Sequence, residues 1–223
     1  MRHVLVFDAN ETLLDLGALD PIFAQLFGDP AARREWFGQL LQSAFLSTIT
    51  NAYRDFGALG TTALAMVAAR RGLMLTEAQV AALRAGMRAL PAHPEARPAL
   101  EELHQAGFRL ATLTNSTAEV GEAQLRAAGL RDLFEQALSA DAVQRLKPAP
   151  EPYRMAAERL GIAPAELRQV AAHGWDVTGA ARAGCAAAFV ARPGQVLDPA
   201  GVAPEIVGAN LREVAIRIIA RDR

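Results

Sequence analysis

Asp8 stands directly after a short apolar run near the start of the sequence, where a carboxylate can take part in chemistry. The run at residues 4–7 is rich in branched side chains, as in a strand that is buried on both faces. In an open parallel sheet, ligands bind just beyond the carboxyl ends of the strands. Asp8 is therefore a candidate nucleophile, although an aspartate in this position can also serve only to cap a turn.

Three later apolar runs also end in polar residues that suit catalysis or binding. The polar residues are Thr114 and Asn115 after the first of these runs, Lys147 after the second, and the stretch from His173 to Asp176 after the third. Because parallel strands end at the same edge of a sheet, these groups are expected to meet Asp8 there. An ammonium beside a carboxylate keeps it ionised, which a carboxylate nucleophile requires. The alternative for Lys147 is an ordinary solvated surface lysine.

Strand and helix patterns alternate after about residue 92, and this alternation predicts the fold class. Each connection is long enough for a crossover, which indicates an α/β fold with a doubly wound parallel sheet. The expected strands lie at residues 4–7, 108–113, 134–138, 167–172, 186–190 and 205–207. The expected helices lie at 95–105, 116–129 with Ser116 and Glu119 as a capping box, 148–160, 174–183 and from 210 onward.

Residues 15–91 have a helical pattern throughout and separate the first strand from the rest of the sheet. The pattern includes a long apolar stripe over 36–52 and a capping box that begins at Thr76. We therefore expect an α/β core at residues 1–14 and 92–223, carrying an all-helical cap domain at 15–91. Because the cap is inserted just after Asp8, it should cover the strand ends as a lid.

The composition is typical of a soluble globular protein and disfavours several classes of function. Hydrophobic residues make up 52% of the chain and charged residues 21%, with a net charge of −1. Such a balance argues against nucleic acid or a membrane surface as the main partner. Cys185, the single cysteine, is expected to be buried and inert, and no ligand set for a structural zinc is present. Without a signal-peptide segment or a membrane-spanning run, a cytoplasmic location is expected.

Four motifs, in this order, resemble those of the haloacid dehalogenase superfamily. They are D-x-x-x-T from Asp8 to Thr12, Thr-Asn at a strand end, Lys-Pro, and Trp-Asp in a glycine-rich turn. Within that superfamily the sequence is most similar to the type II L-2-haloacid dehalogenases. This likeness extends to residues 36–56, to Tyr153 after the Lys-Pro pair and to residues 175–180, and it covers essentially the whole chain.

The resemblance implies a role for each residue of these motifs. Asp8 would be the nucleophile that attacks the carbon bearing the halogen, and Lys147 would keep it ionised. Thr12 and Thr114 would hydrogen-bond the nucleophile or the substrate carboxylate, and Asp176 would position or activate the water that hydrolyses the ester. The residues expected to bind the substrate are Ala9, Asn10, Phe37, Phe56, Thr114, Asn115, Tyr153, His173 and Trp175.

The reaction implied by the resemblance is the hydrolysis of short 2-haloalkanoic acids through an aspartyl ester. Its products are a 2-hydroxy acid and a halide ion. The partner is then a small anionic substrate, no cofactor or metal is expected, and the resemblance implies a homodimer.

A phosphatase of the same superfamily is the main alternative. Such enzymes carry a second aspartate two positions after the nucleophile, because an alkoxide leaving group needs a proton. Here that position is Asn10, whose amide cannot supply one at neutral pH, whereas a halide leaves without protonation. Phosphatases also bind Mg²⁺ through acidic residues of the last motif, where this chain keeps only Asp176. A further alternative is a protein that binds a small acid without turning it over.

Two positions depart from the dehalogenase pattern. Phe37 follows the cap tryptophan where the family has an arginine that faces the substrate, and His173 replaces the usual asparagine. Our hypothesis is that His173, together with Arg33 or Arg34, takes over part of the anion binding. The bulk of His173 would also shrink the halide pocket and favour fluoride or chloride.

Overall fold

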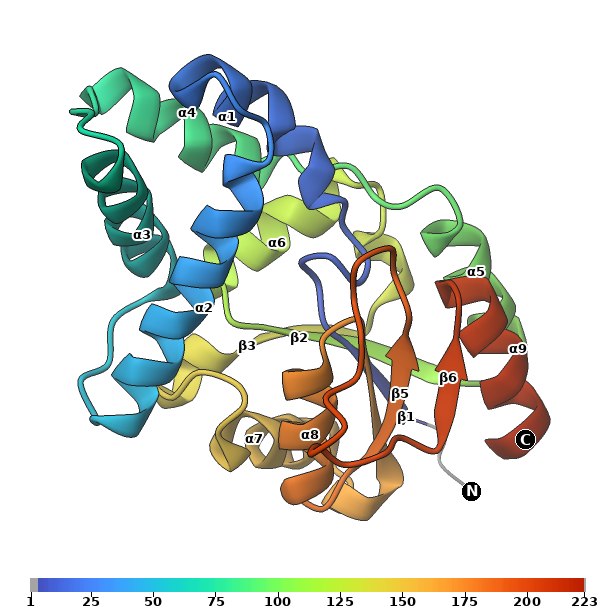
Figure 1. Ribbon diagram of the computed structural model, residues 1–223. Helices are drawn as coiled ribbons and strands as arrows, with labels where there is room; N and C mark the ends of the chain where they lie inside the picture. The colour runs from blue at the N-terminus through green and yellow to red at the C-terminus, as the bar shows by residue number, and fades with distance from the viewer. Residues whose placement is uncertain (1–3, 223) are drawn as a thin grey trace.

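A six-stranded parallel sheet forms the centre of the molecule in the computed structural model, which describes residues 4–222 (Figure 1). The strand order is β3-β2-β1-β4-β5-β6, and every neighbouring pair is parallel. The strands are β1 (Val4–Phe7), β2 (Arg109–Thr114), β3 (Gln136–Ser139), β4 (Leu167–Ala171), β5 (Ala186–Val190) and β6 (Ile206–Gly208). The predicted doubly wound α/β fold is confirmed, and β1 lies where the strand order reverses, the usual place for a ligand site.

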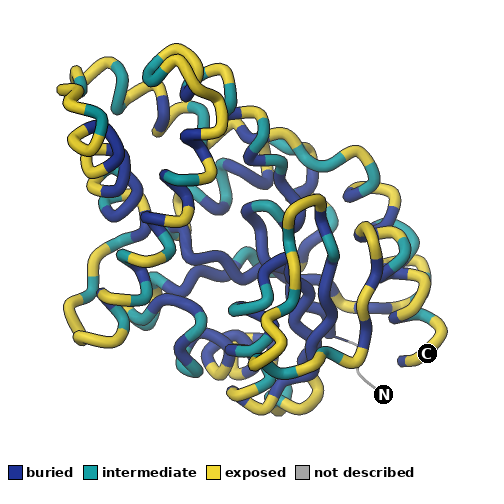
Figure 2. Tube along the Cα trace, in the orientation of Figure 1, coloured by how far each residue is buried: buried dark blue, intermediate teal, exposed yellow. Residues whose placement is uncertain are grey.

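Helices cover both faces of the sheet, and the alternation of side chains along β1 explains why. Leu5 and Phe7 belong to one apolar cluster, whereas Val4 and Val6 belong to another on the opposite face. Figure 2 shows these strands as a buried layer. The first face is covered by α5 (Ala96–Gln105), α6 (Ala118–Ala127) and α9 (Leu211–Asp222), and the second by α7 (Pro150–Leu160) and α8 (Gly174–Arg182).

The segment between β1 and α5 is helical, as the sequence predicted. It contains a 3₁₀ turn η1 (Leu16–Leu19) and helices α1 (Asp20–Phe27), α2 (Ala32–Ile49), α3 (Phe56–Arg70) and α4 (Glu77–Arg88). Thr76 caps α4 in a capping box with Gln79, as expected. The indole of Trp36 is buried in this segment and donates to the carbonyl of Gly60 at 2.9 Å.

The helical segment leaves and rejoins the core at one point. The backbone N–H of Asp15 donates to the carbonyl of Pro91 at 2.9 Å, and Leu14 forms an antiparallel bridge with Ala92. The two crossings therefore lie side by side, as in an inserted unit. The exact domain limits at residues 14 and 92 stay a prediction.

One expected helix start is wrong. Ser116 was predicted to cap the helix after β2, but the side chain of Thr117 accepts from Val120 N and is the actual N-cap of α6. Ser116 remains tied to the strand ends, because its N–H donates to Thr114 Oγ1 and its carbonyl accepts from Ser139. The helix therefore begins one residue later.

The remaining elements are the short 3₁₀ turns η2 (Arg131–Leu133), η3 (Ala140–Val143) and η4 (Pro164–Glu166).

No helix within residues 4–222 is both long and apolar enough to cross a bilayer.

Candidate active site

Asp8 lies at the carboxyl end of β1, and two donors hold its carboxylate. Its backbone N–H still donates to Val170 of β4, so the strand ladder fixes the start of the loop. Lys147 Nζ lies 2.9 Å from Oδ1, and Thr12 Oγ1 donates to Oδ2 at 2.9 Å. The Thr12 hydroxyl also accepts from the N–H of Ala172, which sets its donor direction. Two of the residues predicted to be catalytic therefore contact Asp8 directly.

Lys147 is completely buried between two carboxylates. Its ammonium contacts Asp8 Oδ1 at 2.9 Å, Asp176 Oδ2 at 2.8 Å and the carbonyl of Leu113 at 2.8 Å. Burial by itself lowers the pKa of Lys147, but Asp176 and Asp8 outweigh it and raise the pKa above its ordinary value. The ammonium is thus charged and uses all three of its donors, so its orientation is fixed.

Two side chains donate hydrogen bonds to the carboxylate of Asp176, which lies at the start of α8. Tyr153 of α7 donates its hydroxyl to Asp176 Oδ1 at 2.5 Å, and Gln169 of β4 donates to Oδ2 at 3.1 Å. Burial and the nearby carboxylate of Asp176 raise the pKa of Tyr153 well above its ordinary value, so the phenol stays a donor. Tyr153 is fully buried, so the structure places it as a support for Asp176.

Asn115 and Thr114, at the end of β2, hold neighbouring backbone. Asn115 Oδ1 accepts from the N–H of Lys147 at 2.8 Å, and its amide donates to the Lys147 carbonyl at 3.2 Å. These two bonds position the residue that carries the ammonium. The hydroxyl of Thr114 accepts from the N–H of Ser116 at 3.1 Å, which leaves its own proton available to another acceptor.

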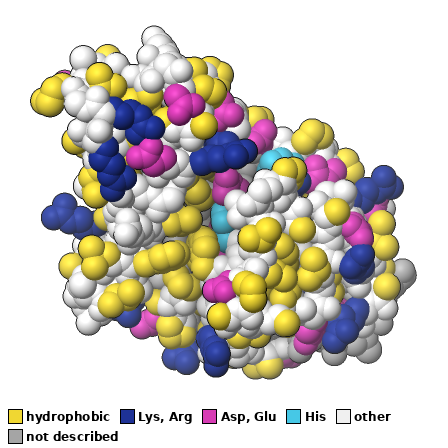
Figure 3. Space-filling view, viewed as in Figure 1, with side chains coloured by type: hydrophobic (Ala, Val, Ile, Leu, Met, Phe, Trp, Pro, Cys, Tyr) yellow, Lys and Arg dark blue, Asp and Glu magenta, His cyan; other side chains and the backbone are white. Residues whose placement is uncertain are grey.

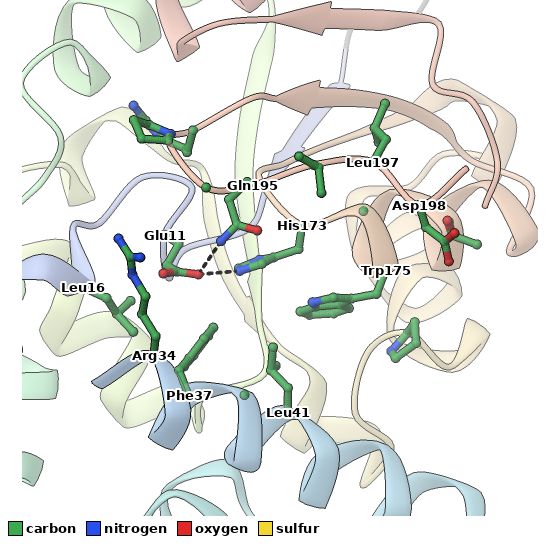
Figure 4. A pocket seen from close by; sticks show the side chains of 18 of the residues that line it. Glu11, Leu16, Arg34, Phe37, Leu41, His173, Trp175, Gln195, Leu197 and Asp198 are labelled. Carbon is green, nitrogen blue, oxygen red and sulfur yellow. Dashed lines mark hydrogen bonds and ion pairs between the residues drawn. The ribbon is translucent and has the colours of Figure 1, made fainter. Parts of the chain in front are cut away.

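His173 bridges Asp8 and Glu11. Its Nδ1 lies 3.4 Å from Asp8 Oδ2, and its Nε2 lies 2.9 Å from Glu11 Oε2. Gln195 donates to the same oxygen of Glu11 at 2.9 Å, as the dashed lines in Figure 4 show. Glu11 has a φ of 62°, in the left-handed region that residues other than glycine seldom adopt. Such a conformation persists only where the surrounding structure holds it, and the Glu11 carboxylate is held by His173 and Gln195.

The charges of this group determine its protonation. Burial by itself raises the pKa of Asp8, but Lys147 and His173 outweigh it and hold the pKa well below its usual range. Burial lowers the pKa of His173, yet Asp8 and Glu11 outweigh it and raise the pKa to about 9. At neutral pH the site therefore holds an ionised Asp8 beside an imidazolium ion.

An aromatic row forms the wall of the main cavity next to this group. The ring of His173 lies 5.8 Å from that of Phe37 and 5.1 Å from that of Trp175, with the latter pair stacked. All three side chains line a cavity of about 1250 Å³. Figure 3 shows this hollow between the helical segment and the core, with hydrophobic side chains along it. Trp175 Nε1 is buried and has no hydrogen-bond partner within the described residues.

The structure also places the remaining predicted residues. Ala9 and Asn10 are buried in the loop after β1, and Asn10 accepts from Gln124 at 3.1 Å. Phe56 lies in a second, smaller cavity of about 260 Å³, together with Trp36 and Ser116.

The two arginines of the anion-binding hypothesis differ. Arg33 contacts Asp20 at 2.5 Å and lies 3.6 Å from Glu11, so acidic partners already engage it. Arg34 lines the main cavity from α2 (Figure 4).

Sequence reasoning missed three residues of this site. Glu11 was visible as an acid between Asp8 and Thr12, but nothing in the sequence connected it with His173. Gln169 and Gln195 gave no signal, because glutamine is common in strands and loops without any such role.

Within residues 4–222, no cluster of three or more His, Cys, Asp and Glu side chains could hold a metal ion.

Comparison with known proteins agrees with this geometry. A family model described as haloacid dehalogenase-like hydrolase matches residues 3–184. The (S)-2-haloacid dehalogenase of Xanthobacter autotrophicus is 30% identical over 95% of this chain and 82% of its own. The (S)-2-haloacid dehalogenase 4A of Burkholderia cepacia is 33% identical over 80% of this chain and 78% of its own. A solved structure of the L-2-haloacid dehalogenase from X. autotrophicus superposes with a TM-score of 0.93 and 27% identity, covering all of both chains. Another structure of that enzyme has chloropropionic acid covalently bound, with the same TM-score and identity.

Proposed function

Because the chain belongs to the haloacid dehalogenase-like hydrolases, within the family of the (S)-2-haloacid dehalogenases, we propose that it hydrolyses 2-haloalkanoic acids. The products are the 2-hydroxy acid and a halide ion, and the reaction proceeds through an ester on Asp8. The observation that carries this proposal is the ionised Asp8 carboxylate, held by Lys147 and Thr12 at the end of β1. The covalent chloropropionic acid in the X. autotrophicus enzyme supports the same chemistry.

In the first half of the reaction, a carboxylate oxygen of Asp8 attacks C2 of the substrate. The new carbon–oxygen bond forms as the carbon–halogen bond breaks, and the halide departs with the bonding electrons. A halide is a weak base and needs no proton, which suits Asn10 at the position where an acid would otherwise stand. Lys147 keeps Asp8 charged and fixes its orientation, which favours attack.

In the second half, water attacks the carbonyl carbon of the ester. Once Asp8 is an ester it carries no negative charge, so one of the two acidic partners that raise the pKa of His173 is gone. His173 can then release its proton to solvent and, as a neutral imidazole, accept one from the attacking water. Glu11 holds the imidazole in position through Nε2.

The collapse of the ester regenerates the nucleophile. The bond between Asp8 Cγ and the product oxygen breaks, and that oxygen takes the proton held by His173 to become the 2-hydroxyl group. The second proton of the water leaves Asp8 as it ionises again and passes to His173, which restores the imidazolium ion of the resting site. Lys147, fixed by Asp176, stabilises the returning charge.

The crowding next to Asp8 supports a preference among halides. His173 and Phe37 have their rings 5.8 Å apart, where the family pattern has an asparagine and an arginine. Rings in these places leave less room than an open pocket, so fluoride and chloride are the favoured leaving groups. Short substrates such as 2-chloropropanoic acid already carry the two groups that the reaction requires, a carboxylate and a halogen on C2.

The homodimer remains a prediction of the resemblance, and the cytoplasmic location remains a prediction of the sequence.

Halide release from 2-chloropropanoic acid tests this function. The wild-type chain should release chloride without added metal, whereas Asp8→Asn should lose turnover and keep affinity for the 2-hydroxy acid. A parallel assay uses a generic phosphate ester with and without Mg²⁺. Metal-dependent phosphate release without any halide release would overturn the proposal in favour of a phosphatase.

A further inference from the structure

The main cavity is larger than a three-carbon acid needs. Its volume is about 1250 Å³, whereas pockets of about 300–1,000 Å³ enclose drug-sized ligands. It is bounded by α2 on one side and by the chain at residues 192–199 on the other. Figure 4 shows Glu11 on the left of the cavity, His173 near its middle and Asp198 on the right. Asp8 is not itself part of the lining, but His173 both contacts Asp8 and lines the cavity, so this space lies one side chain away from the reacting group.

Apolar side chains from three parts of the chain line the cavity beyond His173. Phe37 and Leu41 come from α2, Trp175 from α8 and Leu197 from the chain after β5. Leu41 and Trp175 lie on opposite sides in Figure 4. A substituent that extended from the reacting carbon between them would be removed from water on both sides, which favours an apolar group.

One apolar residue of the lining is largely exposed to water. Val196 lines the cavity and is 80% exposed, among the most exposed large hydrophobic residues of residues 4–222. Isolated exposed hydrophobic residues are common, but this one continues the apolar lining formed by Leu197 and Trp175. An apolar ligand that fills the cavity would cover it.

From this cavity we infer that the preferred substrate is a 2-haloacid with a long or ring-bearing apolar substituent on C2, such as 2-chlorooctanoic or 2-chloro-3-phenylpropanoic acid. The inference rests on the proposed dehalogenation and names its substrate class. The carboxylate and halogen lie at Asp8, and the substituent runs past His173 between Leu41 and Trp175. The chemical steps are those already described, since only the group on C2 changes.

The test compares kcat/KM for halide release from 2-chloropropanoic and 2-chlorooctanoic acid, each corrected for uncatalysed hydrolysis. The longer acid should be preferred at least about tenfold, since each buried methylene favours binding. Leu41→Trp, which fills the cavity, should reduce this ratio at least about fivefold. The matched control is Ile49→Trp on the same helix, where the side chain is 79% exposed and is not part of the lining, and it should leave the ratio unchanged.

The outcomes separate the inference from the proposed function. Chloride release from 2-chloropropanoic acid with no preference for the longer acid would overturn the inference and leave the dehalogenase proposal standing. A preference that Leu41→Trp does not reduce would also overturn it, because the substituent would then lie elsewhere. A lack of halide release from every acid would overturn the proposed function and the inference with it.

Discussion

Replacing Asp8 by asparagine should lower the pKa of His173 from about 9 to its ordinary value near 6.5 or below. Asparagine is neutral, as the ester is, and it has nearly the same shape as aspartate. Nδ1 of His173 lies 3.4 Å from the Asp8 carboxylate. Two opposite charges at that distance attract by about 5 kcal/mol at an effective dielectric constant of about 20. At 1.36 kcal/mol per pKa unit, this attraction is large enough to account for the whole rise of the His173 pKa from its ordinary value to about 9.

The titration can be followed directly by nuclear magnetic resonance of the histidine rings. The chain has 4 histidines, and the signal of His173 is the one that disappears in His173→Gln. The wild-type midpoint should lie near 9, and the Asp8→Asn midpoint below about 7. Asp198→Asn is a matched control, because it removes a carboxylate that lines the same cavity and accepts from the N–H of Ala200.

A midpoint that stays near 9 in Asp8→Asn would refute the reasoning. Glu11 would then hold the proton on His173 whether or not Asp8 is charged. Formation of the ester could not turn the imidazolium into a base, and the water would need another activating group.

Four further predictions concern the same site. The raised pKa of His173 should stabilise the fold by about 3 kcal/mol below pH 6.5, and this stabilisation should be lost as the pH rises through 9; urea unfolding of wild type and His173→Gln checks this. Glu11→Gly should relieve about 1 kcal/mol of backbone strain yet lower turnover at least about tenfold, whereas Glu11→Gln should lower turnover without the gain in stability. Lys147→Ala should cost about 3–5 kcal/mol of unfolding free energy, because two buried carboxylates lose their counter-ion. Tyr153→Phe should cost about 1–3 kcal/mol, because Asp176 loses a donor; an unchanged denaturation midpoint in either variant would contradict its account.

The elements that carry the site were predictable from the sequence. Asp8, Lys147 and Asp176 each follow an apolar run, and parallel strands bring such positions to one edge of the sheet. The long helix with its buried Trp36 was visible as an apolar stripe, and Thr76 as a capping box. These features depend on local sequence and on simple packing rules, which is why they could be read without a structure.

The hydrogen-bond partners of the individual side chains within the site were not predictable. Asn115 and Tyr153 were expected to line the substrate pocket, which stays a prediction, and nothing in the sequence indicated that their polar groups would hold the Lys147 backbone and the Asp176 carboxylate. The hydrogen-bond partner of a buried amide or phenol depends on contacts between segments that are far apart in the sequence. The pair of Glu11 and Gln195 has the same origin, since 184 positions separate the two residues in the sequence.

Single turnover in heavy-oxygen water tests the central claim most directly. With enzyme in excess over 2-chloropropanoic acid, water should attack the ester carbonyl, so the heavy oxygen should appear in the Asp8 side chain after one turnover. The 2-hydroxy acid formed in that turnover should carry ordinary oxygen taken from Asp8, as mass spectrometry of the peptide and the product would show. Heavy oxygen in the 2-hydroxy acid and none in Asp8 would mean that water attacks C2 directly, and would contradict the account.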